Sequence, residues 1–203
     1  MRDKEQNIME NGRLRKQLDF IVEADKEKRI ERITHITGHI RPENDAEHAW
    51  HMALMTYLLA EYSDEPIDIA KTMAMCLIHD IVEIDAGDTY AYDEEGKKTQ
   101  ADREAKAADR IYGLLPEDQN IALRSLFEEF EERKTPEARF ARLMDNLQPL
   151  LLNVENGGGD WTSHHVKAEQ VKRRNEHNAE SSKALADFVL HTIDEQKRLG
   201  RLE

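Results

Sequence analysis

The sequence predicts an all-α protein built as a helical bundle, and three observations support this class. Apolar residues recur three and four positions apart over most of the chain, which is the period of an amphipathic helix. No segment shows a convincing strand-like alternation, and the 9 Gly and 5 Pro residues stand mainly at breaks between periodic segments. A chain of 203 residues suits one full hydrophobic core, so we expect residues 1–203 to form a single domain.

Composition limits the classes of partner. The net charge of −13 and the pI near 5.2 argue against nucleic-acid polymers and anionic membranes, although a mononucleotide could bind at a local site. Cys76 is the only cysteine, which excludes a disulfide framework and favours a reducing compartment. The first residues are charged, and no apolar segment approaches the roughly 20 residues that span a bilayer. We therefore expect a soluble, cytoplasmic protein.

A first amphipathic helix is indicated near the N-terminus by Leu14, Leu18, Ile21 and Val22. Residues 34–44 then lack helical periodicity and include Gly and Pro, so we expect an exposed connection without regular structure. His35, His39 and Arg41 lie in this connection and are free to face a ligand, although most loop histidines and arginines are simply solvated.

The next helix is predicted from residue 46 to about residue 62, with Asp45 as its N-cap. It carries two apolar stripes, one of Trp50, Leu54, Tyr57 and Leu58 and the other of Met52, Met55 and Leu59. A helix that is apolar over so much of its surface is expected to be central in the bundle. His48 lies one turn before Met52, on the second stripe. A lone histidine there is more often a core residue hydrogen-bonded to a backbone carbonyl than a ligand.

The rest of the chain is organised around residues 67–88. The apolar run over residues 73–82 contains only two strongly polar residues, His79 and Asp80. An ionised carboxylate in such surroundings costs on the order of several kcal/mol unless it is paired. A metal ion and an arginine from elsewhere in the fold are equally good partners for Asp80. On one continuous helix His79 and Asp80 share a flank, and Glu83 lies within one turn of both.

The remaining elements follow from similar signals. Residues 85–98 are expected to form a loop, followed by helices that begin at Thr99 and at Pro116. Thr135, followed by a proline, is a typical helix start, and Asp145 is a second acid among the apolar residues of that helix. Helices over residues 162–198 are expected to pack on this core through Ala184, Leu185, Phe188 and Ile193.

The set His48, His79-Asp80 and Asp145 resembles the HD-domain superfamily of metal-dependent phosphohydrolases. There, a histidine on one helix, an adjacent His-Asp pair on a second and an aspartate on a later helix form the motif, and all four positions match. The stretches Arg41-Pro-Glu-Asn-Asp-Ala-Glu-His48 and Cys76-Leu-Ile-His-Asp-Ile-Val-Glu83 are similar to the branch that contains 5′-deoxynucleotidases. The resemblance covers about residues 24–152 and implies the HD-domain helical bundle.

This resemblance implies one divalent metal ion, held by His48, His79, Asp80 and Asp145, with positions left for water and a phosphate oxygen. Manganese, cobalt, magnesium, zinc and iron all fit such a ligand set. The resemblance also implies that Glu83 and Asp88 are the catalytic residues beside the metal-bound water. The expected reaction is phosphate release from a phosphomonoester, and the expected partner is a small nucleoside 5′-monophosphate.

Arg41 and His39 are the candidate substrate contacts, although an ion pair of Arg41 with Glu43 or Glu47 is an equally good alternative. The characterised nucleotidases of this branch carry an Arg-Trp pair ahead of the first histidine, where this chain offers Arg32-Ile33 and, nearer His48, Gly38-His39, with no tryptophan. The preference between ribose and deoxyribose therefore cannot be read from the sequence, and neither can the base.

Two other functions stay open at this stage. A di-iron oxygenase on the same scaffold would need ligands for a second ion, and only His51, one turn from His48, suggests one. A regulatory domain could keep the metal for stability without turnover, although Glu83 and Asp88 argue for catalysis. The family resemblance and the apolar-rich helices also predict a homodimer.

Overall fold

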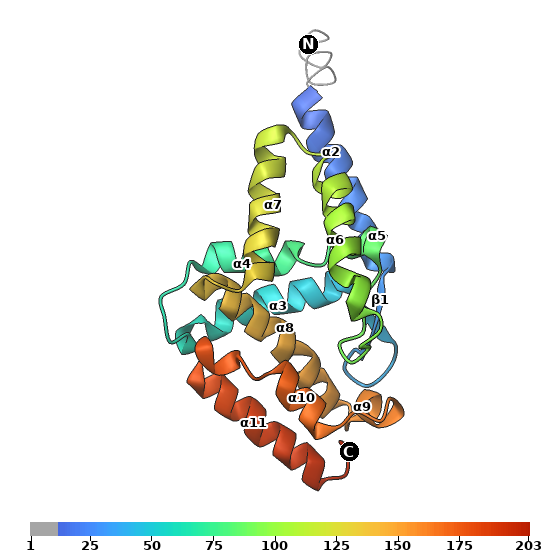
Figure 1. The fold of residues 1–203 in the computed structure, drawn as a ribbon, viewed down its shortest axis with the longest axis vertical. Helices are drawn as coiled ribbons and strands as arrows, with labels where there is room; N and C mark the ends of the chain where they lie inside the picture. The colour runs from blue at the N-terminus through green and yellow to red at the C-terminus, as the bar shows by residue number, and fades with distance from the viewer. Residues whose placement is uncertain (1–11) are drawn as a thin grey trace.

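The computed structural model describes residues 12–203, which form a helical molecule with one short β-hairpin (Figure 1). The first half contains α2 (Gly12–Ala24), η1 (Asp25–Arg29), β1 (Glu31–His35), β2 (Pro42–Asn44), α3 (Asp45–Leu59), η2 (Ala60–Tyr62), α4 (Ile69–Ile78) and α5 (Glu83–Ala86). The second half contains α6 (Lys97–Tyr112), α7 (Glu117–Glu132), α8 (Pro136–Glu155), α9 (Gly159–Ser163), α10 (Ala168–Arg174), η3 (Asn178–Glu180) and α11 (Lys183–Arg198). The predicted all-α bundle is confirmed, and no helix of the described part could cross a membrane.

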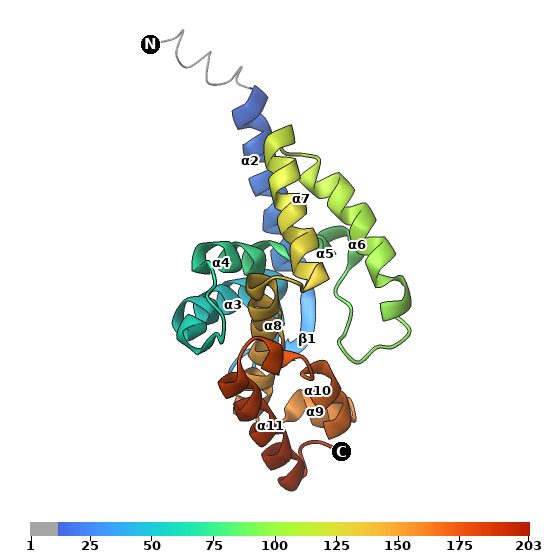
Figure 2. The same cartoon turned by 60° about the vertical axis from the view of Figure 1, so that its left-hand side comes forward.

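The helices surround two apolar cores. Helices α2, α6 and α7 stand together at one end of the molecule, α3, α4 and α8 cross its middle, and α10 and α11 lie at the other end (Figures 1 and 2). The larger core joins α3, α4 and α8 to α10 and α11, whereas the smaller core joins α2, α6 and α7. In α11 the contact with the larger core is made by Leu185, Val189 and Ile193, and Phe188, which we expected there, is 47% exposed.

The apolar run that contains His79 and Asp80 is not one continuous helix, and the prediction is wrong in this respect. Helix α4 ends at Ile78, and α5 begins only at Glu83. The intervening turn lets Ile81 and Val82 enter the smaller core, while α4 itself packs into the larger one. His79 and Asp80 are thereby held at the boundary between the two cores.

A β-hairpin includes both ends of the connection that we expected to lack regular structure, at residues 34–35 and 42–44, whereas residues 36–41 form its loop. Strands β1 and β2 pair in antiparallel fashion, with Glu31 opposite Asn44. They are too short and too irregular in register to leave a readable alternation in the sequence. The Asn156 side chain fastens the hairpin loop to the end of α8, because it accepts a hydrogen bond from Gly38 N (2.9 Å) and donates one to the His35 carbonyl (3.0 Å). Gly38 has φ +84°, which favours glycine at this turn.

Two predicted helix starts shift by one or two residues. Asn44, rather than Asp45, caps α3 through a capping box with Glu47, in which the Glu47 N–H donates to Asn44 Oδ1 (3.0 Å). Asp45 is therefore the first helical residue, and its carboxylate is buried. Helix α6 begins at Lys97 rather than at Thr99. The predicted start of α8 is confirmed, since the Thr135 side chain accepts a hydrogen bond from the Ala138 N–H.

Helix α3 buries only one of its two apolar stripes. Met52 and Met55 lie in the larger core, where α4 and α8 cover them. The other stripe faces outward, with Trp50 62%, Leu54 41%, Tyr57 64% and Leu58 59% exposed. The helix is therefore central on one side only, and an apolar surface of four residues is left on the other.

Candidate functional site

The four residues predicted as metal ligands meet at the boundary between the two cores. His48 comes from α3, His79 and Asp80 from the turn after α4, and Asp145 from α8, and all four are buried. His48, His79 and Asp145 each offer a ligand atom, and these atoms lie within 4.8 Å of one another. Asp80 Oδ2 lies 3.0 Å from His79 Nε2 and 3.9 Å from His48 Nε2. The fold thus brings together residues that are far apart in the sequence.

Hydrogen bonds orient both imidazole rings toward this cluster. His79 Nδ1 donates to the Cys76 carbonyl (2.9 Å), which leaves Nε2 facing the cluster. His48 Nδ1 lies 2.9 Å from Gln148 Oε1. The Gln148 amide is itself oriented, because its Nε2 donates to Glu43 Oε2 (2.8 Å). In each ring the Nδ1 proton is therefore donated to an oxygen outside the cluster, as is usual for metal-binding histidines.

The resulting arrangement fits a divalent cation. His48 Nε2 lies 3.2 Å from Asp145 Oδ1, so an unprotonated nitrogen faces a carboxylate oxygen with no proton to join them. His79 Nε2 is buried and makes no hydrogen bond of good geometry. A cation placed among these atoms would satisfy all of them at once, and mixed imidazole and carboxylate ligands suit several divalent metals.

The electrostatics of the two histidines differ. Burial lowers the pKa of His48 to about 4, which keeps this ring neutral at physiological pH. Burial also acts to lower the pKa of His79, but Asp80 and other neighbours outweigh it and raise the value to about 9. Without a metal, His79 therefore carries a proton that Asp80 compensates. Metal binding has to displace this proton.

Asp145 stays ionised although it is buried. Burial alone would raise its pKa, but the guanidinium groups of Arg142 and Arg174 hold the pKa well below the usual range. Arg142 Nη1 lies 3.1 Å from Asp145 Oδ2, and Arg174 Nη2 lies 3.5 Å from the same oxygen. A carboxylate that is charged at all physiological pH values is ready to bind a cation.

Arg32 is a site residue that our sequence analysis did not predict. Its Nη1 lies 2.8 Å from Asp80 Oδ2 and 2.9 Å from Asp45 Oδ1, and the side chain is only 12% exposed. Three more carboxylates lie within 4.0 Å of its guanidinium, those of Glu43, Glu83 and Asp88. Asp80 therefore has the arginine partner that the sequence left as an alternative, and it also lies beside the histidines. The useful signal was Arg32-Ile33, one of the two places that the sequence offered for the Arg-Trp pair of the nucleotidases it resembles.

Glu83 and Asp88, the predicted catalytic residues, lie beside the cluster. Burial and the charges of Asp80 and Asp45 raise the pKa of Glu83 to about 12. Burial also raises the pKa of Asp88, although Arg32 opposes that shift. Glu83 Oε2 is buried without a hydrogen-bond partner. In the metal-free protein Glu83 therefore holds a proton at neutral pH, directly beside the candidate ligands.

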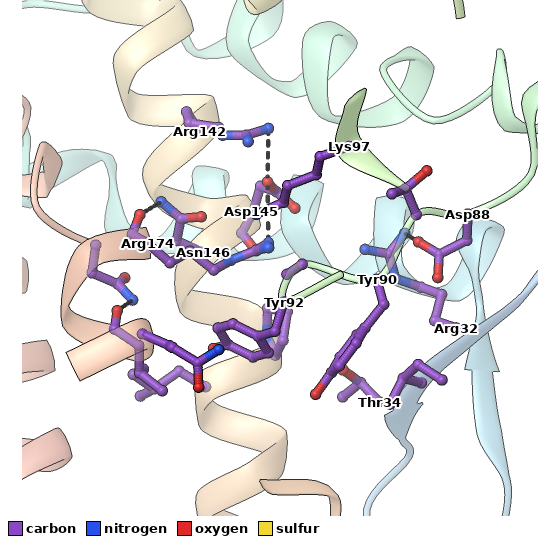
Figure 3. A pocket seen from close by; sticks show the side chains of 18 of the residues that line it. Arg32, Thr34, Asp88, Tyr90, Tyr92, Lys97, Arg142, Asp145, Asn146 and Arg174 are labelled. Carbon is purple, nitrogen blue, oxygen red and sulfur yellow. Dashed lines mark hydrogen bonds and ion pairs between the residues drawn. The ribbon is translucent and has the colours of Figure 1, made fainter. Parts of the chain in front are cut away.

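The cluster opens into a cleft of about 540 Å³. Figure 3 shows Arg32 and Asp88 at one end of the cleft and Arg142 and Lys97 around Asp145. Tyr90 and Tyr92, from the loop after α5, also line it. Their rings meet edge to face, with centroids 5.3 Å apart. The cleft therefore offers carboxylates, cations and aromatic faces to one ligand of modest size.

The two predicted substrate contacts lie elsewhere. Arg41 is exposed and forms a two-point ion pair with Glu47 (2.8 and 2.5 Å), which is one of the alternatives that the sequence left open. His39 Nε2 lies 3.1 Å from Asp160 Oδ1, and its ring stacks on that of His35. Neither Arg41 nor His39 is among the residues that line the cleft. Their placement supports a role in holding the hairpin loop rather than contact with a substrate.

Comparison with known proteins agrees with this geometry. A family model described as the HD domain matches residues 24–186. The chain belongs to the HD-domain family. A crystal structure of a predicted metal-dependent phosphohydrolase from Magnetospirillum magnetotacticum MS-1 superposes on this HD-domain protein with a TM-score of 0.90 at 48% identity, covering 94% of this chain and 96% of the other. The resemblance stated from the motif residues is thereby confirmed.

Relatives in eukaryotes carry a more specific name. The human 5′-deoxynucleotidase HDDC2 is 30% identical over 135 residues, which cover 66% of this HD-domain protein and 65% of the human one. The 5′-deoxynucleotidase hdd1 of Schizosaccharomyces pombe is 27% identical over 117 residues, which cover 56% of this chain and 58% of the yeast protein. The matched region thus spans somewhat less than two thirds of these relatives.

Charged residues of the site also act on Glu27, a buried residue of η1. Glu27 is 6% exposed, and its Oε1 has no hydrogen-bond partner. Burial, and then the charges of Asp80 and Asp45, raise its pKa to about 8. The folded protein therefore binds a proton that the unfolded chain has lost, so this group lowers the free energy of unfolding as pH rises from about 4.5 to 8.

Glu27→Gln should remove the decrease in free energy of unfolding that this carboxyl group causes as pH rises. We expect the variant to exceed the native protein in free energy of unfolding by roughly 2–4 kcal/mol at pH 8.5 and by much less at pH 5, as measured by urea unfolding. Glu31→Gln, at an exposed position two residues after η1, is the control and should follow the native curve. An equal effect of Glu27→Gln at both pH values would contradict the raised pKa.

Proposed function

We propose that this protein is a metal-dependent phosphohydrolase that releases phosphate from a nucleoside 5′-monophosphate. The observation that carries the proposal is the buried cluster of His48, His79 and Asp145, with ligand atoms within 4.8 Å of one another and Asp80 alongside. Relatives named 5′-deoxynucleotidase and the neighbour named a metal-dependent phosphohydrolase support the same reaction class.

In this proposal His48, His79, Asp80 and Asp145 hold one divalent ion. When bound, such an ion lowers the pKa of a coordinated water and offsets negative charge on the phosphoryl oxygens. Its identity among manganese, cobalt, magnesium, zinc and iron is a matter for measurement, because imidazole and carboxylate ligands suit all of them.

The residues of the chain supply binding and proton transfer. Arg32 lines the cleft, and because its Nη1 donates to Asp45 and Asp80, only its other N–H groups can donate to a phosphate. Glu83 lines the cleft beside the candidate metal ligands and, when protonated, can give its proton to the leaving 5′-oxygen as the P–O bond breaks. Asp88 lies at the mouth of the same cleft and can orient the sugar or the reacting water. Tyr90 and Tyr92 offer ring faces to the base or sugar.

A single metal ion accounts for the site better than a di-iron centre. The carboxylates that a second ion would need are present, since Asp45, Glu83 and Asp88 offer oxygens within 4.8 Å of one another. Arg32 Nη1 lies among them, however, at 2.9, 4.0 and 3.9 Å. Because this guanidinium already supplies the positive charge, a second metal is not required for charge balance.

The first test concerns the metal. The native protein should bind one divalent ion per chain, and His79→Gln should weaken this binding at least about a hundredfold because one of the ligands is lost. Metal content after dialysis and titration calorimetry with manganese measure the change. His165→Gln, with a side chain that is 80% exposed, is the control and should bind as the native protein does. Equal binding by His79→Gln would place the metal elsewhere.

The second test concerns turnover. Phosphate release from a panel of ribo- and deoxyribonucleoside 5′-monophosphates should require added manganese, cobalt or magnesium. Glu83→Gln should lower kcat at least about a hundredfold while the metal stays bound, because the proton donor is lost. Asp85→Asn, on the exposed side of the same short helix, should stay near the native rate. Robust release by metal-free enzyme would refute the mechanism, and no release from any nucleotide by metal-loaded protein would favour a regulatory role.

We also infer that the protein forms a homodimer through the exposed stripe of α3. Trp50, Tyr57 and Leu58 are each about three fifths exposed, and contiguous apolar patches of this kind mark interfaces. Light scattering should report a dimer for the native protein, and Tyr57→Glu should shift it toward monomer because it places a charge in the contact. Phe188→Glu, at an exposed aromatic position of α11, is the control and should stay dimeric. A monomeric native protein at working concentration would contradict this inference.

A further inference from the structure

One side of the cleft is strongly cationic, although the chain as a whole has a net charge of −13. Five basic residues line this side, which we name the cationic wall: Lys97, Arg133, Arg142, Arg173 and Arg174. They come from α6, from the end of α7, from α8 and from α10, so the fold has gathered them from four separate helices. Like charges held close together raise the energy of the folded state unless an anion compensates them.

Three members of the cationic wall have carboxylate partners. Arg142 and Arg174 share the single carboxylate of Asp145, at 3.1 and 3.5 Å. Arg173 pairs with Glu94 at 2.6 Å. Two guanidinium groups on one carboxylate leave a net positive charge at this point of the cleft.

The other two members have no carboxylate partner. Within residues 12–203, no carboxylate lies within 4.0 Å of the Lys97 ammonium or of the Arg133 guanidinium, whereas most basic side chains of the same residues have one. Glu104 and Glu131 also line the cleft but pair with neither, and Glu104 instead accepts a hydrogen bond from Gln100. Lys97 and Arg133 therefore line the cleft without an ion pair, and the charges of Glu94 on Lys97 and of Glu131 and Asp145 on Arg133 act only from a greater distance.

Arg133 is held close to other cations at the end of α7. Its φ of +56° lies in the left-handed region, which is unfavourable for a residue other than Gly, at the point where α7 ends beside the cleft. Burial and the neighbouring charges of Arg142 and Arg174 lower the pKa of Arg133 more than Glu131 and Asp145 raise it. Burial is also the main cause that lowers the pKa of Lys97. Both groups would gain from a bound anion.

One phosphate at the candidate metal ligands accounts for only part of the cationic wall, because among its members only Arg142 and Arg174 pair with a candidate ligand, Asp145. Arg32, at the other end of the cleft in Figure 3, already has five carboxylates within 4.0 Å. Lys97 and Arg142 lie around Asp145 in the same view. The wall therefore has room and charge for a further anionic group on the same ligand.

We propose that the substrate carries a second phosphate group and that Lys97, Arg133 and Arg142 bind it. The inference rests on the proposed function, because it adds a second phosphate group to the nucleotide that the same site would hydrolyse. In a 3′,5′-bisphosphate the chemistry is unchanged: water attacks the 5′-phosphorus, the bond from phosphorus to the 5′-oxygen breaks, the 5′-oxygen takes up a proton, and inorganic phosphate is released, while the 3′-phosphate adds binding energy without reacting. In a 5′-diphosphate water attacks the terminal phosphorus, the phosphoanhydride bond breaks, and the nucleoside 5′-monophosphate leaves as inorganic phosphate is released.

Turnover tests this proposal with three matched compounds: deoxyadenosine 5′-monophosphate, deoxyadenosine 3′,5′-bisphosphate and deoxyadenosine 5′-diphosphate. We expect kcat/KM to be at least about tenfold higher for one of the two-phosphate compounds, since charge-assisted hydrogen bonds have this order of effect. Which of the two is preferred reports the position of the second phosphate. The double variant K97Q/R133Q should reduce the preference at least tenfold.

The control is the double variant K98Q/K134Q, which removes the basic residues next in sequence. Lys98 pairs with Glu95 (2.6 Å) and Lys134 with Glu132 (3.1 Å), and neither lines the cleft. This control loses the same net charge as K97Q/R133Q and should keep the native preference. An equal loss in both variants would reveal a general charge effect and would overturn the proposal.

Binding without turnover separates this inference from the proposed function. Calorimetric titration of metal-free protein with deoxyadenosine 3′,5′-bisphosphate and with the 5′-diphosphate should show at least tenfold weaker binding to K97Q/R133Q than to K98Q/K134Q. Metal-dependent release from the monophosphate with no preference for a second phosphate would overturn the inference and leave the proposed function intact. Binding that depends on Lys97 and Arg133, without phosphate release from any compound, would support the second-phosphate site and refute the proposed function.

Discussion

The buried guanidinium of Arg32 is the interaction on which the site depends. Five carboxyl groups lie within 4.0 Å of it, from Glu43, Asp45, Asp80, Glu83 and Asp88. Removing one partner of a buried ion pair typically costs about 3–5 kcal/mol, and here several acids would lose their counter-charge at once. Arg32 also ties β1 to α3, to the turn after α4 and to the loop after α5. The same contact therefore supports the local fold and permits a dense group of acids beside the candidate metal ligands.

Asp145 joins this acidic group to the cationic wall. On one side its Oδ1 faces His48 Nε2 at 3.2 Å, and on the other its Oδ2 pairs with Arg142 and Arg174. The arginines keep the carboxylate ionised in a buried place, so it can serve a cation without first losing a proton. The charge that lines the cleft consequently changes from negative to positive over a short distance. Such a gradient suits a ligand with separate anionic groups, one for the metal and one for the wall.

The predictions that succeeded depend on a few adjacent residues, whereas those that failed depend on long-range packing. His79 and Asp80 could be found because a polar pair inside an apolar run must have a partner, whatever the fold. The start of α8 at Thr135 could be found because capping is a matter of a few adjacent residues. The helix through His79 failed because the sequence does not reveal that Ile81 and Val82 enter a different core from α4. The apolar stripe of Trp50 and Tyr57 likewise looked central, since periodicity cannot say how many neighbours cover a helix.

The sequence by itself determined the helical class and the residues able to bind a metal, because both depend on residue type and short-range spacing. Only the tertiary structure decided which arginine serves the site. Arg32 lies in β1 and Arg41 directly before β2, but the pairing of the strands turns Arg32 inward to Asp80 and leaves Arg41 outside with Glu47. The cationic wall was equally beyond the sequence. Its members come from four helices whose meeting is set by the packing of two cores, and long-range packing leaves no mark in local residue patterns.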